Sequence, residues 1–273
     1  MDKLAALAIT LLGLLGSVAC HQGLTVGYYN KSGTPYYCPI VKKAVEKAIK
    51  ENPGIGAGLV RLFFHDCFVR PPQVRGDIDA AKAELENNPA CRGKVSCADN
   101  VAFATRDAAR NLSYGAIDFA MPAGRLDGRV SLKAEAERNL LWPFDTLDDL
   151  EKSFAEQGLD PHDMITLSGA HSFGVARCRF FGNRLPPSNT SDMDHDLANS
   201  LNVTCKSNGP DFRVVQDPVT SVALDNQYYK NVHSGKVLFT SDAGAQLHGA
   251  ERAPLLLYYS RCRGRRRKAH LLG

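Results

Sequence analysis

The chain has 273 residues and a modest net charge of +4, with 44% hydrophobic and 23% charged residues. This length allows one large single-core domain or two lobes. Basic residues are concentrated in one run near the C-terminus, 261–268, and no aromatic residues are interleaved with them, so nothing resembles a nucleic-acid-binding module. This basic tail is either a solvated C-terminus or a site of adhesion to polyanions.

The N-terminus has the features of an export signal. An apolar run at 4–15 is followed by small residues at 16–19. Such a short run is typical of a secretory signal peptide rather than of a membrane span. We therefore expect residues 1–21 to be removed and residues 22–273 to form a secreted domain. No later segment is long and apolar enough to cross a membrane.

Eight cysteines in a secreted chain indicate disulfides rather than a thiolate metal site. Cys20 lies in the expected signal, which leaves an odd number, so one mature cysteine should lack an intramolecular partner. Four glycosylation sequons agree with passage through the secretory pathway: Asn30, Asn111, Asn189 and Asn202.

The apolar pattern predicts an all-α protein. Apolar pairs recur with a spacing of about four residues at 40–49, and a helix break follows at Asn52-Pro53-Gly54. Further helices are expected at 55–69, 96–111, 147–157, 161–167, 225–232 and 255–259. Thr146 is a cap-like residue before the helix at 147–157, and Asp160 and Pro161 have the N-cap and first-turn positions of the helix at 161–167.

Arg61 and His65 lie one helical turn apart in the run RLFFHDCFV at 61–69, so they share one face of the predicted helix. A lone histidine beside two phenylalanines is also consistent with a hydrogen-bonded packing residue. The nearby arginine favours a catalytic role for His65, because heterolytic cleavage of a peroxide needs a base that moves a proton. It also needs a cation that stabilises the charge on the departing oxygen.

His171 lies in the run SGAHSFG at 168–174, after two small residues that would let the backbone approach a flat cofactor. A histidine in this context can also simply terminate a helix. A haem iron requires a neutral imidazole whose other nitrogen is held by a hydrogen-bond acceptor, which raises the basicity of the ligand.

Both motifs resemble the distal and proximal motifs of the secretory plant haem peroxidases (class III). The resemblance covers residues 23–242 and includes VSCAD at 95–99, AGRLDG at 123–128, LDNQYY at 224–229 and TSD at 240–242. It implies a two-lobed all-α fold with haem b between a distal and a proximal helix. It also implies a secreted enzyme of the cell wall or apoplast that reduces hydrogen peroxide and oxidises small phenolic donors, in cell-wall phenolic chemistry and the response to oxidative stress.

The resemblance implies roles for individual residues. His65 and Arg61 would be catalytic, and His171 would be the axial ligand of the iron with Asp242 as its acceptor. Phe64 would contact the haem.

Two calcium ions flank the haem in that family, and side-chain and backbone oxygens suit calcium rather than zinc. Four side chains match the proximal ligands, with a backbone carbonyl near Ala223: Ser172, Asp217, Thr220 and Asp225. At the distal site only Asp66 and the Val69 carbonyl have counterparts. We therefore expect one calcium ion, on the proximal side.

The pairing of cysteines in the family implies three bonds, which would leave Cys67 unpaired: Cys38–Cys91, Cys178–Cys205 and Cys97–Cys262. Asp99 and Arg125 match a structural ion pair.

The sequence departs from the family in three places. After Val69 the short segment 70–76 replaces a long loop of the family. This chain therefore lacks three features of that loop: the partner of Cys67, most distal calcium ligands and an asparagine that orients the distal histidine. Leu141 stands where the family has a proline, and it would contact the donor through its backbone carbonyl. After Leu247 a short segment and the basic tail, 261–273, replace the terminal helices. We therefore expect turnover that is present but weak.

Three alternatives remain open. The first is a non-catalytic peroxidase-like protein that binds wall polyanions through its tail, and the second is a mis-spliced product. The third is a zinc hydrolase built from His65, Asp66, Cys67 and His171, although further cysteine or histidine ligands at suitable spacing are lacking.

Overall fold

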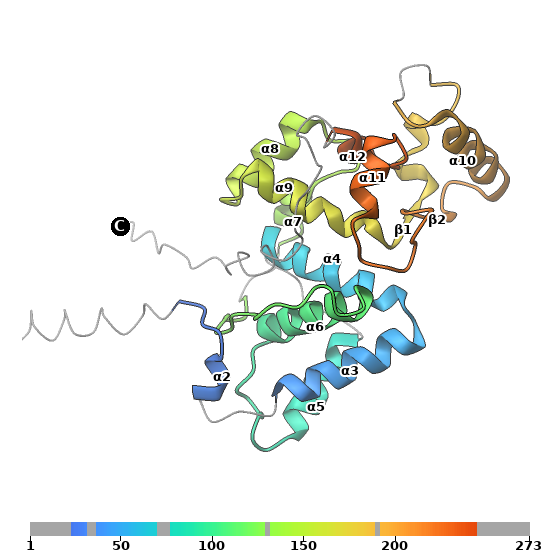
Figure 1. The fold of residues 1–273 in the computed structure, drawn as a ribbon. Helices are drawn as coiled ribbons and strands as arrows, with labels where there is room; N and C mark the ends of the chain where they lie inside the picture. Colours follow the sequence, from blue (N-terminus) through green and yellow to red (C-terminus); the bar gives the residue numbers. More distant parts are fainter. Residues whose placement is uncertain (1–22, 32–36, 70–76, 129–131, 189–191, 245–273) are drawn as a thin grey trace, which may run out of the picture.

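Helices make up most of the protein, as the sequence predicts. The computed structural model describes residues 23–31, 37–69, 77–128, 132–188 and 192–244 (Figure 1). Within these ranges the α-helices are α2 (Tyr28–Lys31), α3 (Tyr37–Glu51), α4 (Gly54–Phe68), α5 (Asp77–Asn87), α6 (Cys97–Leu112), α7 (Lys133–Asn139), α8 (Leu147–Glu156), α9 (Pro161–Ser168), α10 (His195–Asn208), α11 (Gln227–His233) and α12 (Thr240–Gly244). Three short 3-10 helices are also formed: η1 (Gly169–Ser172), η2 (Cys178–Phe180) and η3 (Gly182–Arg184).

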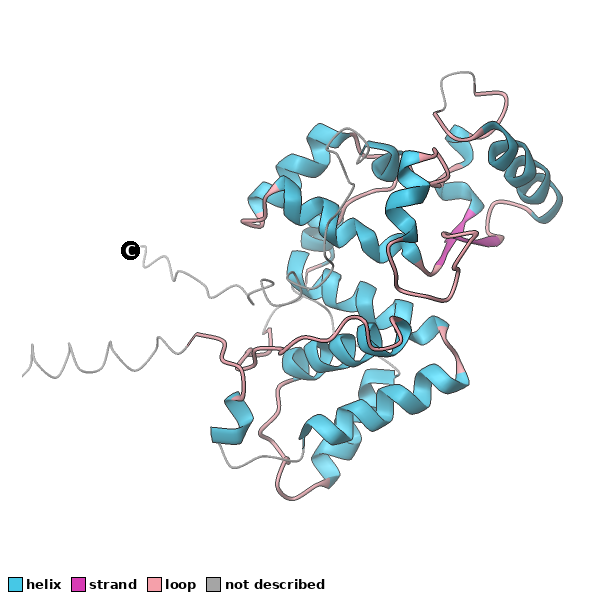
Figure 2. Ribbon diagram, in the orientation of Figure 1, coloured by secondary structure: helices cyan, strands magenta, loops and turns pink. Residues whose placement is uncertain are grey.

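Strands are confined, in the described ranges, to one antiparallel pair (Figure 2). β1 (Val175–Arg177) pairs with β2 (Arg213–Val215), with Ala176 opposite Val214. The all-α prediction is therefore confirmed, apart from this small hairpin.

Six predicted helices are present as α3, α4, α6, α8, α9 and α11, with ends within three residues of those expected. The predicted caps are also formed. Thr146 accepts a hydrogen bond from the backbone amide of Asp149, and Asp160 accepts one from Asp163, each within a reciprocal capping box. The helix predicted at 255–259 lies outside the described residues.

Helix α4 runs between two groups of helices (Figure 1). On one side it packs against α6, which in turn contacts α3 and α5. On the other side lie α8, α9, α11 and α12, where α8 contacts α9 and α12, and η1 contacts both α9 and α11. This arrangement agrees with the two-lobed architecture that the resemblance implies, and it places Arg61 and His65 between the lobes.

Helices α4 and α6 approach each other closely because α4 has a glycine at the contact. A Cβ atom at Gly56 would lie 2.6 Å from a Leu112 side-chain carbon, so a larger residue would require the Leu112 side chain to move. The Thr105 hydroxyl donates a 2.9 Å hydrogen bond to the carbonyl oxygen of Leu59. These contacts fix the helix that carries Arg61 and His65 against the larger hydrophobic core.

The predicted ion pair between Asp99 and Arg125 is formed and buried. Arg125 Nη1 lies 3.1 Å from Asp99 Oδ1, and both side chains are almost completely enclosed. The Tyr29 hydroxyl (2.7 Å) and the Gly124 amide (2.8 Å) donate to Asp99 Oδ2. A buried ion pair needs such additional hydrogen bonds to offset desolvation, so this cluster is structural.

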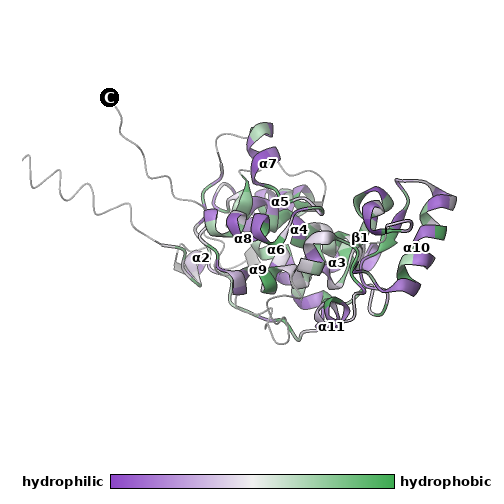
Figure 3. Ribbon diagram, turned by 90° about the horizontal axis from the view of Figure 1, so that it is seen from above, coloured by the Kyte–Doolittle hydropathy of each residue, from purple (hydrophilic) through white to green (hydrophobic). Residues whose placement is uncertain are grey.

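A second, smaller hydrophobic core lies around η2, η3 and α10, at one end of the molecule (Figures 1 and 3). It includes Phe181, Leu185 and Leu201, and a disulfide between Cys178 and Cys205 crosses it. None of the described helices is both long and apolar enough to cross a membrane.

Candidate functional site

Arg61 and His65 are brought together by one turn of α4. Arg61 Nε donates a 3.3 Å hydrogen bond to His65 Nε2. Burial, and then the positive charge of Arg61, lower the pKa of His65 to about 4. The imidazole is therefore neutral at ordinary pH and has a base at Nε2, next to a permanent cation.

The Nδ1 atom of His65 has no hydrogen-bond acceptor among the residues that the structure describes. Within this part of the chain His65 forms one side-chain hydrogen bond, to Arg61, and one tilted ring contact with Phe64, whose centroid lies 6.3 Å away. Because an acceptor at Nδ1 would hold the ring in one orientation, this histidine is held less firmly than a doubly bonded one. Phe64 itself stacks on Phe68 at 4.3 Å.

His171 lies in η1, directly after α9, and its partner comes from a distant part of the chain. His171 Nδ1 and Asp242 Oδ1 are 2.7 Å apart, which brings together the residues that the resemblance paired. Burial alone would lower the pKa of His171, but the charge and hydrogen bond of Asp242 outweigh it, so the pKa is raised. The Asp242 side chain is 3% exposed, whereas that of His171 is 37% exposed.

Asp242 has a further donor that sequence reasoning missed. The Tyr228 hydroxyl donates a 3.1 Å hydrogen bond to Asp242 Oδ1, the oxygen that also contacts His171. Asp242 Oδ2 is buried and has no hydrogen-bond partner in the described part of the chain. Tyr228 belongs to the LDNQYY motif, so the signal was present, but nothing in the sequence showed which tyrosine points to the carboxylate.

The segment that leads into α12 is held by Arg184 of η3. This buried guanidinium donates through Nη1 to the carbonyl oxygens of Val237 (2.7 Å) and Phe239 (2.9 Å). Its Nη2 contacts the carboxylate of Asp192. Asp242 lies three residues after Phe239, so Arg184 anchors the segment that leads to this carboxylate.

The segment that carries His171 lies against the helix that carries Arg61 and His65. A Cβ atom at Gly174, three residues after His171, would lie 3.6 Å from the Ala57 Cβ of α4. The proximal loop therefore packs against the distal helix.

This donor set fits a haem iron. His171 Nδ1 is engaged by a buried carboxylate, which leaves Nε2 available to coordinate a metal, and the ring remains partly exposed. A neutral imidazole with an acceptor on its other nitrogen is the arrangement that haem ligation requires.

The predicted proximal calcium residues form two linked groups. Ser172 Oγ contacts the Ala223 carbonyl (3.4 Å) and accepts from the Asp225 amide (3.3 Å). The Asp217 carboxylate accepts hydrogen bonds from the amide (3.1 Å) and hydroxyl (3.0 Å) of Thr220. A backbone bond of 3.0 Å joins Ala223 to Thr220. Ser172 and Asp217 are fully buried, so their side-chain oxygen atoms lie inside the protein.

At the distal calcium position, Asp66 lies on α4 next to His65, and Val69 is the C-cap residue of that helix. Burial raises the pKa of Asp66 to about 6, although the Arg125 charge opposes the shift. No group of three metal-binding side chains includes Asp66 within the described ranges.

Leu141, the predicted donor contact, is half-buried and packs against the larger core. It follows α7 by two residues, and Asn139 at the end of α7 is bonded to the C-terminus of α4. The segment with Leu141 is thereby attached to the distal helix.

The disulfides correct part of the predicted pairing. The bond between Cys178 and Cys205 is formed, as predicted. Cys91 and Cys97 are free thiols, so the predicted Cys38–Cys91 and Cys97–Cys262 bonds are wrong.

Cys67 is disulfide-bonded, so the prediction that it is the unpaired cysteine is also wrong. The resemblance implied an unpaired Cys67 because the cysteine that pairs with it in the family has no counterpart after Val69, but Cys67 forms a disulfide in this structure. A disulfide sulfur cannot ligate zinc as a thiolate, which removes the alternative zinc site that included Cys67.

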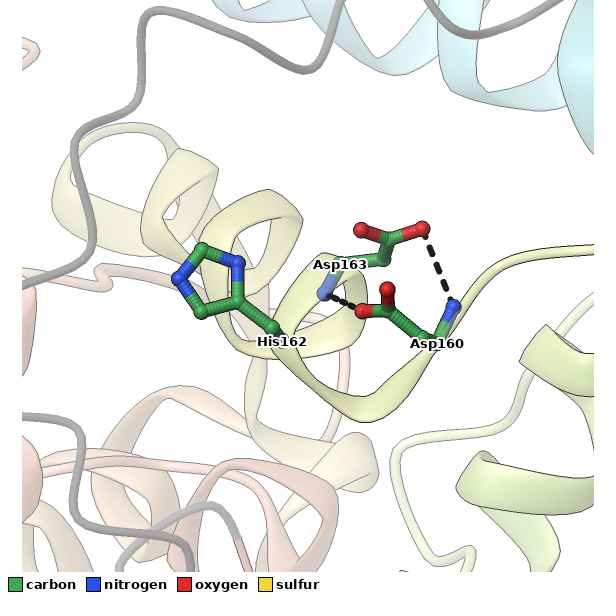
Figure 4. A group of neighbouring side chains, drawn as sticks. All are labelled: Asp160, His162 and Asp163. Carbon is green, nitrogen blue, oxygen red and sulfur yellow. Dashed lines mark hydrogen bonds between the residues drawn. The ribbon is translucent and has the colours of Figure 1, made fainter.

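One other cluster of potential metal ligands occurs in the described ranges: Asp160, His162 and Asp163 at the start of α9 (Figure 4). Asp160 Oδ1 accepts from the Asp163 amide (2.8 Å), and Asp163 Oδ2 accepts from the Asp160 amide (3.0 Å). These carboxylates already cap the helix, so the cluster is explained by helix capping.

Several predictions lie outside the described residues: the signal peptide at 1–21, Cys262, the sequon at Asn189 and the basic tail at 261–273. The side chain of Cys38 is likewise not described.

The chain is similar to known proteins over most of its length. The model of the peroxidase family matches residues 72–253. Peroxidase 2 of Zea mays is 43% identical, over 89% of this chain and 81% of the relative. Peroxidase 5 of Vitis vinifera is 39% identical, over 87% and 80% respectively. The lignin-forming anionic peroxidase of Nicotiana sylvestris is 34% identical, also over 87% and 80%. His171 and Asp242 lie within the range that the family model matches, whereas Arg61 and His65 precede it.

Proposed function

Because this chain belongs to the peroxidase family, we propose that it is a secreted haem peroxidase in which His171 binds the iron and His65 and Arg61 act on hydrogen peroxide. The single observation that carries the proposal is the 2.7 Å contact between His171 Nδ1 and the buried Asp242 carboxylate. It joins residues 71 positions apart in the way that an iron-binding imidazole requires. A histidine that only ended a helix would have no need of this partner.

A bound haem supplies the redox-active iron at which the peroxide is reduced. His65 Nε2 accepts a proton from hydrogen peroxide and returns it to the departing oxygen, because its low pKa keeps it neutral. Arg61, whose Nε lies 3.3 Å from that nitrogen, stabilises the negative charge that develops on the departing oxygen. Since His65 Nδ1 has no acceptor among the described residues, we propose that turnover is weak.

The reducing substrates that we propose are small phenols of the plant cell wall. The name of the Nicotiana sylvestris relative, a lignin-forming peroxidase, supports this chemistry. Leu141 would border the donor site through its backbone carbonyl, on the segment that Asn139 attaches to the distal helix.

We propose one calcium ion on the proximal side. Its ligands would be the Ala223 carbonyl and four side chains: Ser172, Asp217, Thr220 and Asp225. Support comes from the buried hydroxyl of Ser172 and the buried carboxylate of Asp217, since oxygen ligands of this kind suit calcium. The position of Ser172, next to the iron ligand, would couple this ion to the haem site.

The proposed location is the cell wall or apoplast. A signal peptide at 1–21 would direct a domain at 22–273 to the secretory pathway. The basic tail at 261–273 would adhere to wall polyanions.

The test is reconstitution of the purified chain with haem. We expect a Soret band and peroxide-dependent oxidation of a phenol such as guaiacol, both largely lost in His171→Ala and retained in His233→Ala, a control at an exposed histidine of α11. An unchanged Soret band in His171→Ala would refute the assignment. Haem binding without any phenol oxidation would instead support a non-catalytic peroxidase-like protein.

A further inference from the structure

Two donors share one oxygen atom of Asp242. His171 Nδ1 lies 2.7 Å from Oδ1, and the Tyr228 hydroxyl lies 3.1 Å from the same atom. The other carboxylate oxygen, Oδ2, is buried and has no hydrogen-bond partner within the described ranges. The negative charge of Asp242 is therefore divided between two donors on one oxygen.

The interaction between Tyr228 and Asp242 is strong because both side chains are buried. Tyr228 and Asp242 are 2% and 3% exposed, so water does not screen their interaction. Burial and the Asp242 charge raise the pKa of Tyr228 well above its usual range, so the phenol remains a donor at working pH. The Ser168 hydroxyl, which also interacts with the Tyr228 side chain, donates to the Met164 carbonyl (2.9 Å).

The physical effect has a definite sign. When the carboxylate attracts the Nδ1 proton of His171, the imidazole becomes a more basic ligand, which stabilises ferric over ferrous iron. A second donor on the same oxygen withdraws part of that charge and weakens the attraction. The Tyr228 hydroxyl therefore opposes the effect of Asp242.

We propose that Tyr228 is a positioning residue that sets the reduction potential of the iron by competing with His171 for Asp242 Oδ1. This inference rests on the proposed role of His171 as the iron ligand. It assigns Tyr228 no contact with either substrate. Its action passes entirely through the carboxylate.

The neighbouring tyrosine provides a matched control. Tyr229 is also buried, at 7% exposure, and its ring centroid lies 5.2 Å from that of Tyr228. Its hydroxyl donates instead to the backbone carbonyls of Ile165 and Thr166, both at 3.3 Å. Tyr228→Phe and Tyr229→Phe each delete one buried hydroxyl next to the site, but only the first changes the donors of Asp242.

The experiment measures the ferric/ferrous midpoint potential of the haem-reconstituted full chain by spectroelectrochemistry. In Tyr228→Phe we expect the ratio of ferric to ferrous affinity to rise by up to about tenfold, which corresponds to a potential about 59 mV lower. The iron–histidine stretching vibration of the ferrous protein should move to higher frequency. Tyr229→Phe should change neither quantity.

A second variant covers the case in which Tyr228→Phe does not fold. Incorporation of 3,5-difluorotyrosine at 228 keeps the ring and makes the hydroxyl a stronger donor, so the potential should rise. Equal potentials in wild type, Tyr228→Phe and the difluorotyrosine protein would overturn the inference, as would a shift of the opposite sign. A Soret band that persists in His171→Ala would refute the proposed function itself, a separate result.

Discussion

The Asn139 side-chain amide donates a 3.2 Å hydrogen bond to the carbonyl oxygen of Phe68, the last residue of α4. Carbonyls in the last turn of a helix have no partner within the helix, so this bond caps the distal helix three residues after His65. Arg138 Nε donates to Asn139 Oδ1 (3.2 Å) and orients the amide. In this way a residue outside the helix supports the end that carries His65.

We expect Asn139→Ala to release this end of α4. The free energy of unfolding, measured in urea, should fall by about 1 kcal/mol because the Phe68 carbonyl loses its partner. Stopped flow should show a slower first reaction with peroxide, because displacement of a base can cost on the order of 100-fold. Asn199→Ala is the control, since it removes only an exposed contact with His195 on α10. An unchanged rate in Asn139→Ala would contradict the capping role.

The pH dependence of the reaction with peroxide should report His65. Burial and the Arg61 charge lower its pKa to about 4, so the rate should stay constant from neutral pH to about pH 5 and fall as the base is protonated near pH 4. His65→Leu should be slow and lack this inflection. A midpoint above pH 6 in the wild type would show that another group is the base.

The same shift contributes to stability. The pKa of an unfolded histidine is about 6.5, so between that pH and about pH 4 the unfolded chain binds more protons at His65 than the folded protein. The contribution is therefore complete above about pH 6.5 and is lost as the pH falls towards 4. Urea titrations of wild type and His65→Leu should diverge over this window.

Metal analysis of purified, extensively dialysed protein should return about one calcium per chain. Asp217→Ala should remove it, because the buried Asp217 carboxylate supplies charge to the proximal oxygen cluster. Asp66→Ala should leave the calcium content unchanged. Two tightly held ions, or one that survives Asp217→Ala, would contradict the single proximal site.

Thiol labelling followed by peptide mass spectrometry tests the revised cysteine pairing. In the native protein an alkylating reagent should modify the exposed Cys97 but not the buried Cys91, and unfolding should expose both. Cys178 and Cys205 should react only after reduction. Replacing both by alanine should cost about 3 kcal/mol of stability, whereas Cys97→Ser should cost almost nothing. If Cys97 did not react in the denatured, unreduced protein, it would have to be part of a disulfide, which would contradict the free thiol.

Local signals in the sequence predicted the longer helices and the distal pair. The apolar spacing and the capping residues Thr146 and Asp160 act over a few positions, so they are readable without the fold. Arg61 and His65 are four residues apart, and helical geometry alone brings them together. The contact between His171 and Asp242 spans 71 positions, and only the family resemblance connected those two residues.

The sequence was less informative where tertiary contacts decide the structure. The short helices α7 and α12, which were not predicted, have seven residues or fewer, too few to be stable alone, so packing against the rest of the protein determines whether they form. Helix α10 and the β1–β2 hairpin depend on the smaller core and its disulfide. The predicted disulfides were partly wrong because a bond depends on which cysteines lie close together in space. A family pattern does not give that proximity in a chain that lacks one of the family's segments.

Arg184 joins two parts of the protein that otherwise have separate hydrophobic interiors. It lies in η3, within the smaller core closed by Cys178 and Cys205, and it binds the carbonyls of Val237 and Phe239 just before α12. The smaller core thus acts as an anchor for Asp242, the hydrogen-bond acceptor of the proposed iron ligand.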